Sequence, residues 1–149
     1  MPETIAIGAD HAGFQLKESL KQSLALQGLA VMDVGCENTD RCDYPDYAAQ
    51  VAQLVLKQHV KWGVLCCGSG VGMAITANRY VGVRAVVCHD LYITEMSRRH
   101  NNANVICFGG RIVAPEYAAD LLDTFFKTPF EGGRHEGRVK KMDTIGEPA

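Results

Sequence analysis

A cysteine beside a glycine-rich loop is the part of this sequence best suited to chemistry. In the run Cys66-Cys67-Gly68-Ser69-Gly70-Val71-Gly72, a thiol is followed by a hydroxyl set among three glycines. Glycines let backbone N–H groups turn toward a ligand, and the start of a helix adds positive partial charge, so such a loop can hold an anion or an oxyanion. A helix N-terminus also favours the thiolate form of cysteine, which makes Cys67 a candidate nucleophile or base. Taken alone, the loop is also compatible with a structural turn.

The six cysteines differ in what their positions indicate. No two of them are spaced as Cys-x-x-Cys, so neither a zinc site nor a redox dithiol is predicted. Successive side chains of a strand face opposite ways, so Cys66 and Cys67 cannot both reach the loop, and we expect Cys67 to face it. The remaining cysteines are interpreted as small buried hydrophobes in a reducing compartment.

Polar side chains follow two other predicted elements. Asp10 and His11 come directly after the first predicted strand. Asp10 is either a plain helix cap or a functional carboxylate, and His11 could bind an anion or a substrate hydroxyl. His100 and Asn101 follow Arg98-Arg99, a basic pair typical of a solvated helix C-terminus. Because they precede a strand, His100 and Asn101 lie at the wrong edge for their own subunit and could serve a neighbouring one.

Arginines after the fifth predicted strand and in the tail form the last cluster. Arg111 follows that strand, and Arg134, His135 and Arg138 lie near the C-terminus. If the tail is helical, Arg134 and Arg138 share one face, and two guanidinium groups suit a phosphate. The alternative is a basic, solvated tail.

Short β-branched runs alternate with stretches of helical period. The strands are predicted at 4–8, 30–34, 62–66, 83–87 and 104–108, and the helices at 14–26, 45–55, 71–80, around 93–96 and at 115–126. This order predicts one Rossmann-like, doubly wound α/β domain over residues 1–149, with five parallel strands and helices on both faces. Ligands of such sheets bind at the carboxyl ends of the strands. We expect the segment from about residue 130 to 149 to be a C-terminal helical arm that packs on a partner subunit.

Composition narrows the class of function. The chain has 149 residues with a formal net charge of -2, and this balance argues against binding to nucleic acid or to an anionic membrane. No apolar run reaches the length of a membrane span, and the first residues lack the pattern of a signal peptide. We therefore expect a cytoplasmic protein that acts on a small molecule.

Five short motifs together resemble the type B ribose 5-phosphate isomerases of the ribose/galactose isomerase superfamily. The similarity runs in order from Ile5 to Ile145. The motifs are Asp10-His11-Ala12-Gly13, Asp43-Tyr44-Pro45, Cys67 to Gly72, Arg99-His100-Asn101, and Glu131-Gly132-Gly133-Arg134-His135-x-x-Arg138. No single motif is decisive, but five in register are specific to this superfamily.

The resemblance implies a reaction and a set of roles. It implies metal-free, cofactor-free interconversion of D-ribose 5-phosphate and D-ribulose 5-phosphate through a cis-enediolate, in a homodimer or dimer of dimers with sites shared between subunits. Cys67 would move the proton between C2 and C1, Ser69 would handle protons on the substrate oxygens, and His100 with Asp10 would open the furanose ring. The N–H groups from Gly68 through Gly70 to Gly72 would stabilise the enediolate. The remaining residues would bind substrate: the phosphate through His11, Arg111, Arg134 and Arg138, and the sugar through Tyr44 and Asn101.

Two departures from the family pattern refine this assignment. A family branch uses a glutamate just after the glycine loop as base, but here that position is Met73, which places the chain in the cysteine branch. Ser69 replaces a common threonine and keeps the hydroxyl. Two alternatives remain open: isomerisation of a hexose 6-phosphate such as allose 6-phosphate or galactose 6-phosphate, and a non-catalytic sugar-phosphate binding module.

Overall fold

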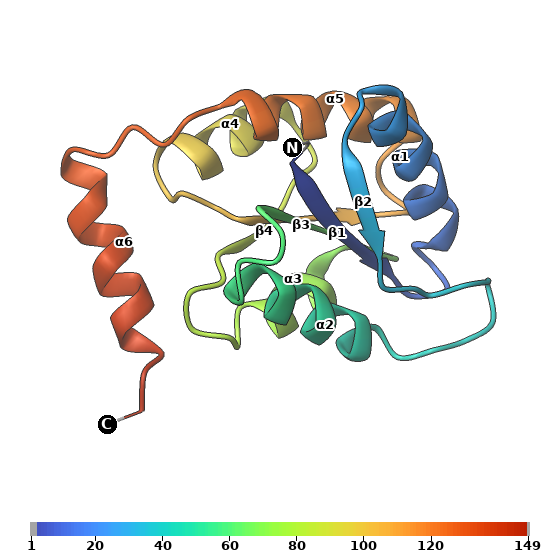
Figure 1. The fold of residues 1–149 in the computed structure, drawn as a ribbon, viewed down its shortest axis with the longest axis horizontal. Coiled ribbons are helices and arrows are strands. Elements are labelled where there is room, and N and C mark those ends of the chain that lie inside the picture. Colours follow the sequence, from blue (N-terminus) through green and yellow to red (C-terminus); the bar gives the residue numbers. More distant parts are fainter. Residues whose placement is uncertain (1–2, 149) are drawn as a thin grey trace.

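A five-stranded parallel sheet lies between two layers of helices. The computed structural model describes residues 3–148 (Figure 1). The strands are β1 (Thr4–Ala9), β2 (Ala30–Asp33), β3 (Trp62–Cys67), β4 (Ala85–Val87) and β5 (Val105–Gly109). The helices are α1 (Phe14–Leu26), α2 (Tyr44–Leu56), α3 (Val71–Ala77), α4 (Leu91–Arg99), α5 (Pro115–Lys127) and α6 (Arg134–Ile145). This order confirms the predicted doubly wound α/β fold.

The strand order opens a crevice between β1 and β3. The sheet runs β2-β1-β3-β5-β4, so the chain passes from β1 to β2 on one side and returns to β3 on the other. Where the winding reverses, the connections leave the two strands in opposite directions. Ala9 is in register with Cys66, and Cys67 with Gly109, so the ends of β1, β3 and β5 lie together. The segments that follow these three strands therefore meet at one edge.

Each face of the sheet has its own hydrophobic core. Helices α1, α4 and α5 cover one face, and α2 and α3 cover the other (Figure 1). Ile5, Ile7 and Cys66 belong to the first core, whereas Ala6, Leu65 and Cys67 belong to the second. Because both faces are buried, β1 and β3 are apolar along nearly their whole length. Within residues 3–148, no helix is both long and apolar enough to cross a membrane.

Three predicted elements are longer than the observed ones: β2 ends at Asp33 rather than at residue 34, and side chains explain the two larger differences. Strand β4 begins at Ala85 rather than at residue 83, because the N–H of Arg84 donates to Oδ1 of Asn104 (2.8 Å). Helix α3 ends at Ala77 rather than near residue 80. The Asn78 side chain bonds both the N–H and the C=O of Ala85 (2.7 and 2.9 Å), which turns the chain toward β4.

Helix α6 lies apart from the body formed by the sheet and its two helix layers. It follows Gly132 and Gly133, which both have positive φ (68° and 54°), and it stands beside the sheet, away from the tips of β1 and β2 (Figure 1). Its own-chain contacts include an ion pair between Asp143 and Arg84 (3.0 Å). The tail is thus helical, as predicted, and its packing on a partner subunit stays a prediction.

Candidate active site

A pocket at the carboxyl ends of β1, β3 and β5 gathers most of the predicted site residues. Its volume is about 570 Å³, and its position is the one expected for a ligand site in a sheet of this topology. It is lined by Asp10, His11, Ala12, Tyr44, Cys67, Gly68, Ser69, Val71, Gly72, Ile75, Arg111 and Ile112. We call this pocket the crevice site.

Cys67 is held by the glycine loop that follows it. Its Sγ accepts a hydrogen bond from the N–H of Gly70 (3.0 Å), and the N–H of Val71 donates to Oγ of Ser69 (3.2 Å). These two loop N–H groups therefore position the thiol and the hydroxyl. Cys66 lies in the opposite core, where burial raises the pKa of its thiol. The predicted division of the two cysteines between the sheet faces is confirmed.

Two of the loop glycines are required by close neighbours. A Cβ on Gly68 would lie 3.0 Å from Nη1 of Arg111, and a Cβ on Gly72 would lie 2.6 Å from the ring of Tyr44. The guanidinium group and the phenol ring therefore pack directly on the backbone of the loop. Gly70 has φ +82, a conformation that other residues rarely adopt.

Asp10 and His11 are fixed by the turn between β1 and α1. The buried carboxylate of Asp10 accepts hydrogen bonds from the N–H groups of Ala12 and Gly13 (2.9 and 3.1 Å). Nδ1 of His11 accepts from the N–H of Cys42 (3.2 Å), so the neutral ring carries its proton on Nε2. Asp10 is therefore not the cap of α1, whose N-cap residue is Gly13: its carboxylate holds the turn before the helix and borders the pocket.

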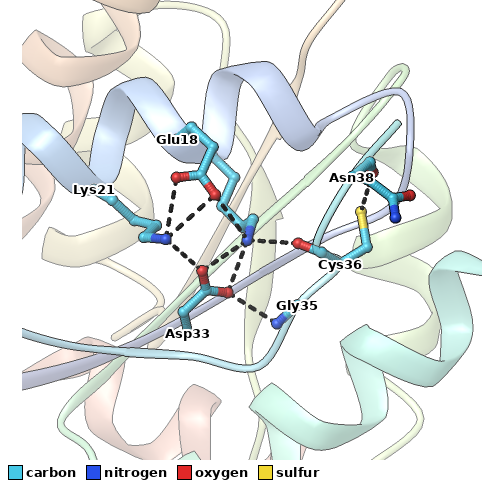
Figure 2. A network of polar contacts seen from close by, with 7 residues as sticks. Glu18, Lys21, Asp33, Gly35, Cys36 and Asn38 are labelled. Atoms are coloured by element: carbon cyan, nitrogen blue, oxygen red, sulfur yellow. Dashed lines mark hydrogen bonds and ion pairs between the residues drawn. The ribbon is translucent and has the colours of Figure 1, made fainter. Parts of the chain in front are cut away.

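A lysine network that sequence reasoning did not identify holds the loop beside His11. The buried Nζ of Lys17 contacts both carboxylate oxygens of Asp33 (2.8 and 2.7 Å) and the C=O of Cys36 (2.8 Å). Figure 2 shows the polar network around the labelled Asp33 and Cys36. Partial burial opposes the charge of Asp33, but its ion pairs with Lys17 and Lys21 prevail and hold the pKa of that carboxyl below its usual value. The network fixes the start of the connection from β2 to α2, at Asp33 and Cys36. Tyr44 is the first residue of α2. The only sequence signal of the network is a lysine on the apolar face of α1.

The other predicted site residues do not border the crevice site within residues 3–148. His100 and Asn101 follow α4 at the amino end of β5, and Arg134 and Arg138 are exposed on α6. The His100 and His135 rings stack with their centroids 4.3 Å apart. We call His100, Asn101, Glu131, Arg134, His135 and Arg138 the arm cluster. As predicted, His100 and Asn101 lie at the wrong edge for the crevice of their own chain.

The interpretation of Arg98 as a solvated residue was wrong. Its guanidinium group is buried, stacks on Trp62 at 4.5 Å, and donates to the C=O of Ala103 (2.6 Å) and of Thr128 (3.2 Å). Arg99 is exposed and pairs with Glu95 (2.7 Å), as the helix-end interpretation predicts. Arg98 instead ties the segment containing His100 to α5. The sequence carried no signal for this, because both arginines occupy the same kind of position.

A set of three potential metal ligands lies within the described chain. His100, Glu131 and His135 each offer a ligand atom, and these atoms lie within 4.8 Å of one another. The set belongs to the arm cluster rather than to the crevice site.

Comparison with known proteins identifies the family. The model of the Ribose/Galactose Isomerase family matches residues 5–142. Ribose-5-phosphate isomerase B of Escherichia coli is 45% identical over 141 residues, which cover 95% of each chain. D-erythrulose-4-phosphate isomerase of Pectobacterium atrosepticum is 39% identical over 144 residues, covering 96% of this chain and 93% of that one.

Solved structures agree with the sequence comparison. A ribose 5-phosphate isomerase from Thermotoga maritima superposes with a TM-score of 0.94 at 46% identity, covering 95% of this chain and 98% of that one. The type B ribose 5-phosphate isomerase of Trypanosoma brucei gives 0.93 at 40% identity, with coverage of 97% and 99%. We conclude that the chain belongs to the ribose/galactose isomerase family.

Proposed function

We propose that this isomerase interconverts D-ribose 5-phosphate and D-ribulose 5-phosphate, with Cys67 as the base. The observation that carries the proposal is the hydrogen bond from the Gly70 N–H to Sγ of Cys67 in the crevice site. A donor at 3.0 Å fixes the position of Sγ beside the loop, and a positioned base is needed for proton transfer at carbon. The family membership supplies the reaction class, aldose–ketose isomerisation of a sugar phosphate.

The proposed chemistry is a proton transfer between adjacent carbons. Cys67 removes the proton from C2 of the aldose, which gives a cis-enediolate, and then delivers a proton to C1 of this intermediate to form the ketose. The O2 hydroxyl must lose a proton and O1 must gain one, and we assign this transfer between the substrate oxygens to the hydroxyl of Ser69. Negative charge develops on the substrate oxygens in between, where Ser69 and the loop around Gly68 supply preorganised donors. His11 and Arg111 border the same pocket and are suited to bind the phosphate. No step requires a metal ion or a cofactor.

We further propose that the arm cluster of one subunit completes the crevice site of another. His100, Asn101, Arg134 and Arg138 cannot act in the pocket of their own chain in this arrangement, although the family resemblance gives all four a role. The rim of the crevice site exposes Ile75 (62%) and Ile112 (60%), and exposed apolar side chains around a polar pocket are typical of a covered surface. In such a homodimer, His100 of one subunit opens the sugar ring and the two arm arginines bind the phosphate.

A pentose phosphate is the favoured substrate, and other sugar phosphates are the alternatives. The relatives named ribose 5-phosphate isomerase cover nearly the whole chain at 40–46% identity. One relative at 39% identity is named for D-erythrulose 4-phosphate, so chain length of the sugar varies among similar proteins.

The test compares turnover of ribose 5-phosphate, allose 6-phosphate and erythrulose 4-phosphate, with EDTA present, by wild type and by Cys67→Ala. We expect turnover that favours the pentose and is lost in the variant. Preference for another sugar would keep the mechanism and replace the substrate. Binding of all three without turnover would replace the isomerase by the sugar-phosphate binding module.

A further inference from the structure

Two histidine nitrogens of the arm cluster converge on one carboxylate. Nε2 of His100 lies 4.0 Å from Oε2 of Glu131, and Nε2 of His135 lies 3.7 Å from Oε1 of the same residue. These separations exceed a hydrogen bond, so the three groups surround a common point without bonding to one another. The residues come from three places in the chain: the end of α4, the segment before α6, and the first turn of α6.

His135 supplies an unsatisfied ligand atom. Its side chain is buried, and Nε2 has no hydrogen-bond partner. A buried imidazole nitrogen with a free lone pair is costly unless something binds it.

We propose that His100, Glu131 and His135 bind a divalent first-row transition metal ion of the Zn²⁺ class, and that the bound ion inhibits the isomerase by occupying His100. Two imidazoles and one carboxylate are a ligand set that Zn²⁺ accepts, with water in the remaining position. The metal site rests on this geometry alone. Its inhibitory effect rests on the proposed function, in which His100 must be free to open the sugar ring.

The geometry requires only small movements to close around an ion. Zinc–nitrogen and zinc–oxygen bonds of about 2.0–2.2 Å bring pairs of ligand atoms to about 3.0–3.5 Å. The ligand atoms now lie within 4.8 Å of one another, so no pair has to approach by more than about 1.8 Å. The stacked rings must also turn, since they are 12° from parallel. His100 and Glu131 are both partly exposed and can make these movements around the buried His135.

Nearby positive charges limit the affinity of this site for a metal ion. Arg99 lies 3.8 Å from Glu131 but makes its short ion pair with Glu95 (2.7 Å). The Glu131 carboxylate therefore stays available to bind a metal ion. Arg134 and Arg138 are exposed on α6, where solvent screens them. The single carboxylate and the open position therefore favour a reversible site rather than a permanent structural one.

The first experiment titrates Co²⁺, a spectroscopic substitute for Zn²⁺, into the full chain without a polyhistidine tag. We expect visible absorption that saturates at one ion per chain, without the thiolate-to-cobalt charge-transfer band that ligation by any of the six cysteines would produce. Failure to bind Co²⁺, or a spectrum dominated by thiolate ligation, would overturn the proposal.

Matched variants locate the ion. Glu131→Gln and His135→Gln should each weaken Co²⁺ binding at least about tenfold, since even outer-sphere partners contribute that much to metal affinity. Glu136→Gln and His59→Gln replace exposed residues of the same types outside the set and should leave binding unchanged. Glu131 is exposed, so its variant should fold even if the buried His135 variant does not. Equal affinity of wild type and Glu131→Gln would contradict the site.

Inhibition is tested separately with Zn²⁺ and ribose 5-phosphate. Each protein is compared with its own rate in EDTA. We expect Zn²⁺ to inhibit wild type and Glu136→Gln reversibly, and Glu131→Gln only at a concentration at least about tenfold higher. Equal inhibition of all three would assign the effect to another group, such as Cys67, and overturn the inhibitory role. If no sugar phosphate turns over, the proposed function fails and the inhibitory role fails with it, while the Co²⁺ titration still decides the metal site.

Discussion

The crevice site and the arm cluster carry residues of one predicted reaction, yet they are held in different ways. In the crevice site, backbone N–H groups fix Cys67, Ser69, Asp10 and His11 at the ends of packed strands. In the arm cluster, His100 and His135 stack on each other and α6 makes few contacts with its own chain.

The difference teaches where a partner is needed. A site held by buried backbone is positioned before any ligand or partner arrives. A set of polar side chains on a lightly packed helix gains its position only from what it contacts next. We therefore expect the crevice site to supply the chemistry and the arm cluster to depend on a second subunit.

The largest expected effect is on the chemical step of the crevice site. Cys67→Ala removes the proposed base and should lower kcat about 10²- to 10⁴-fold with a modest change in KM, because the loss is confined to proton transfer. Cys66→Ala, in the opposite core, is the control. Steady-state kinetics with ribose 5-phosphate measures both, and equal losses in the two variants would contradict the assignment of faces.

The next effect concerns substrate binding by the arm cluster. Arg134→Ala should raise KM roughly tenfold or more with a smaller change in kcat, since one charge-assisted hydrogen bond to phosphate contributes about 1.5–3 kcal/mol. Lys140→Ala, a neighbouring exposed cation of α6, is the control and should leave KM near the wild-type value.

Mixing the Cys67→Ala and Arg134→Ala proteins, each impaired at low substrate concentration, tests whether the two regions act across subunits. Random exchange of Cys67→Ala and Arg134→Ala subunits gives one intact shared site in half of the dimers, so about a quarter of wild-type activity should return at substrate levels below KM. If each site lay within one chain, the mixture would show only the average of its two components.

A smaller effect is expected on the stability of the segment before the arm cluster. Arg98→Met leaves the buried carbonyl group of Ala103 and the partly buried one of Thr128 without this donor and should lower the free energy of unfolding by about 1–3 kcal/mol. Arg99→Met, at the exposed neighbouring position, should change it by less than about 0.5 kcal/mol. Urea unfolding of both variants decides whether Arg98 acts as this anchor.

The smallest effect is a pH dependence specific to the arm cluster. The folded-state pKa of His135 is lowered below its usual 6.5, by desolvation first, so protonation favours the unfolded chain. The stabilising contribution of the neutral His135 ring is fully present above pH 6.5 and declines as the pH falls toward the folded-state pKa of that ring. We expect the stability difference between wild type and His135→Gln to shrink over that range, as measured by urea unfolding at several pH values. If the stability difference between wild type and His135→Gln grew on acidification, folding would raise the pKa of His135 instead of lowering it.

Much of the fold and of the crevice site was determined by the sequence itself. Apolar β-branched runs separated by helical periods specify parallel strands covered on both faces, and their order places the residues after β1 and β3 at one edge. Alternation along β3 separates Cys66 from Cys67, and the glycines are needed where Arg111 and Tyr44 approach the backbone. These features depend on local pattern, which one sequence contains.

The tertiary structure decided what depends on contacts distant in the chain. Arg98 and Arg99 occupy similar positions at the end of α4, and only packing against Trp62 and α5 buries one of them. Lys17 is buried because Asp33 and the Cys36 carbonyl lie opposite it. The meeting of His100, Glu131 and His135 likewise follows from where α6 starts. Burial and pairing of charged groups depend on such neighbours, so periodicity alone could not predict them.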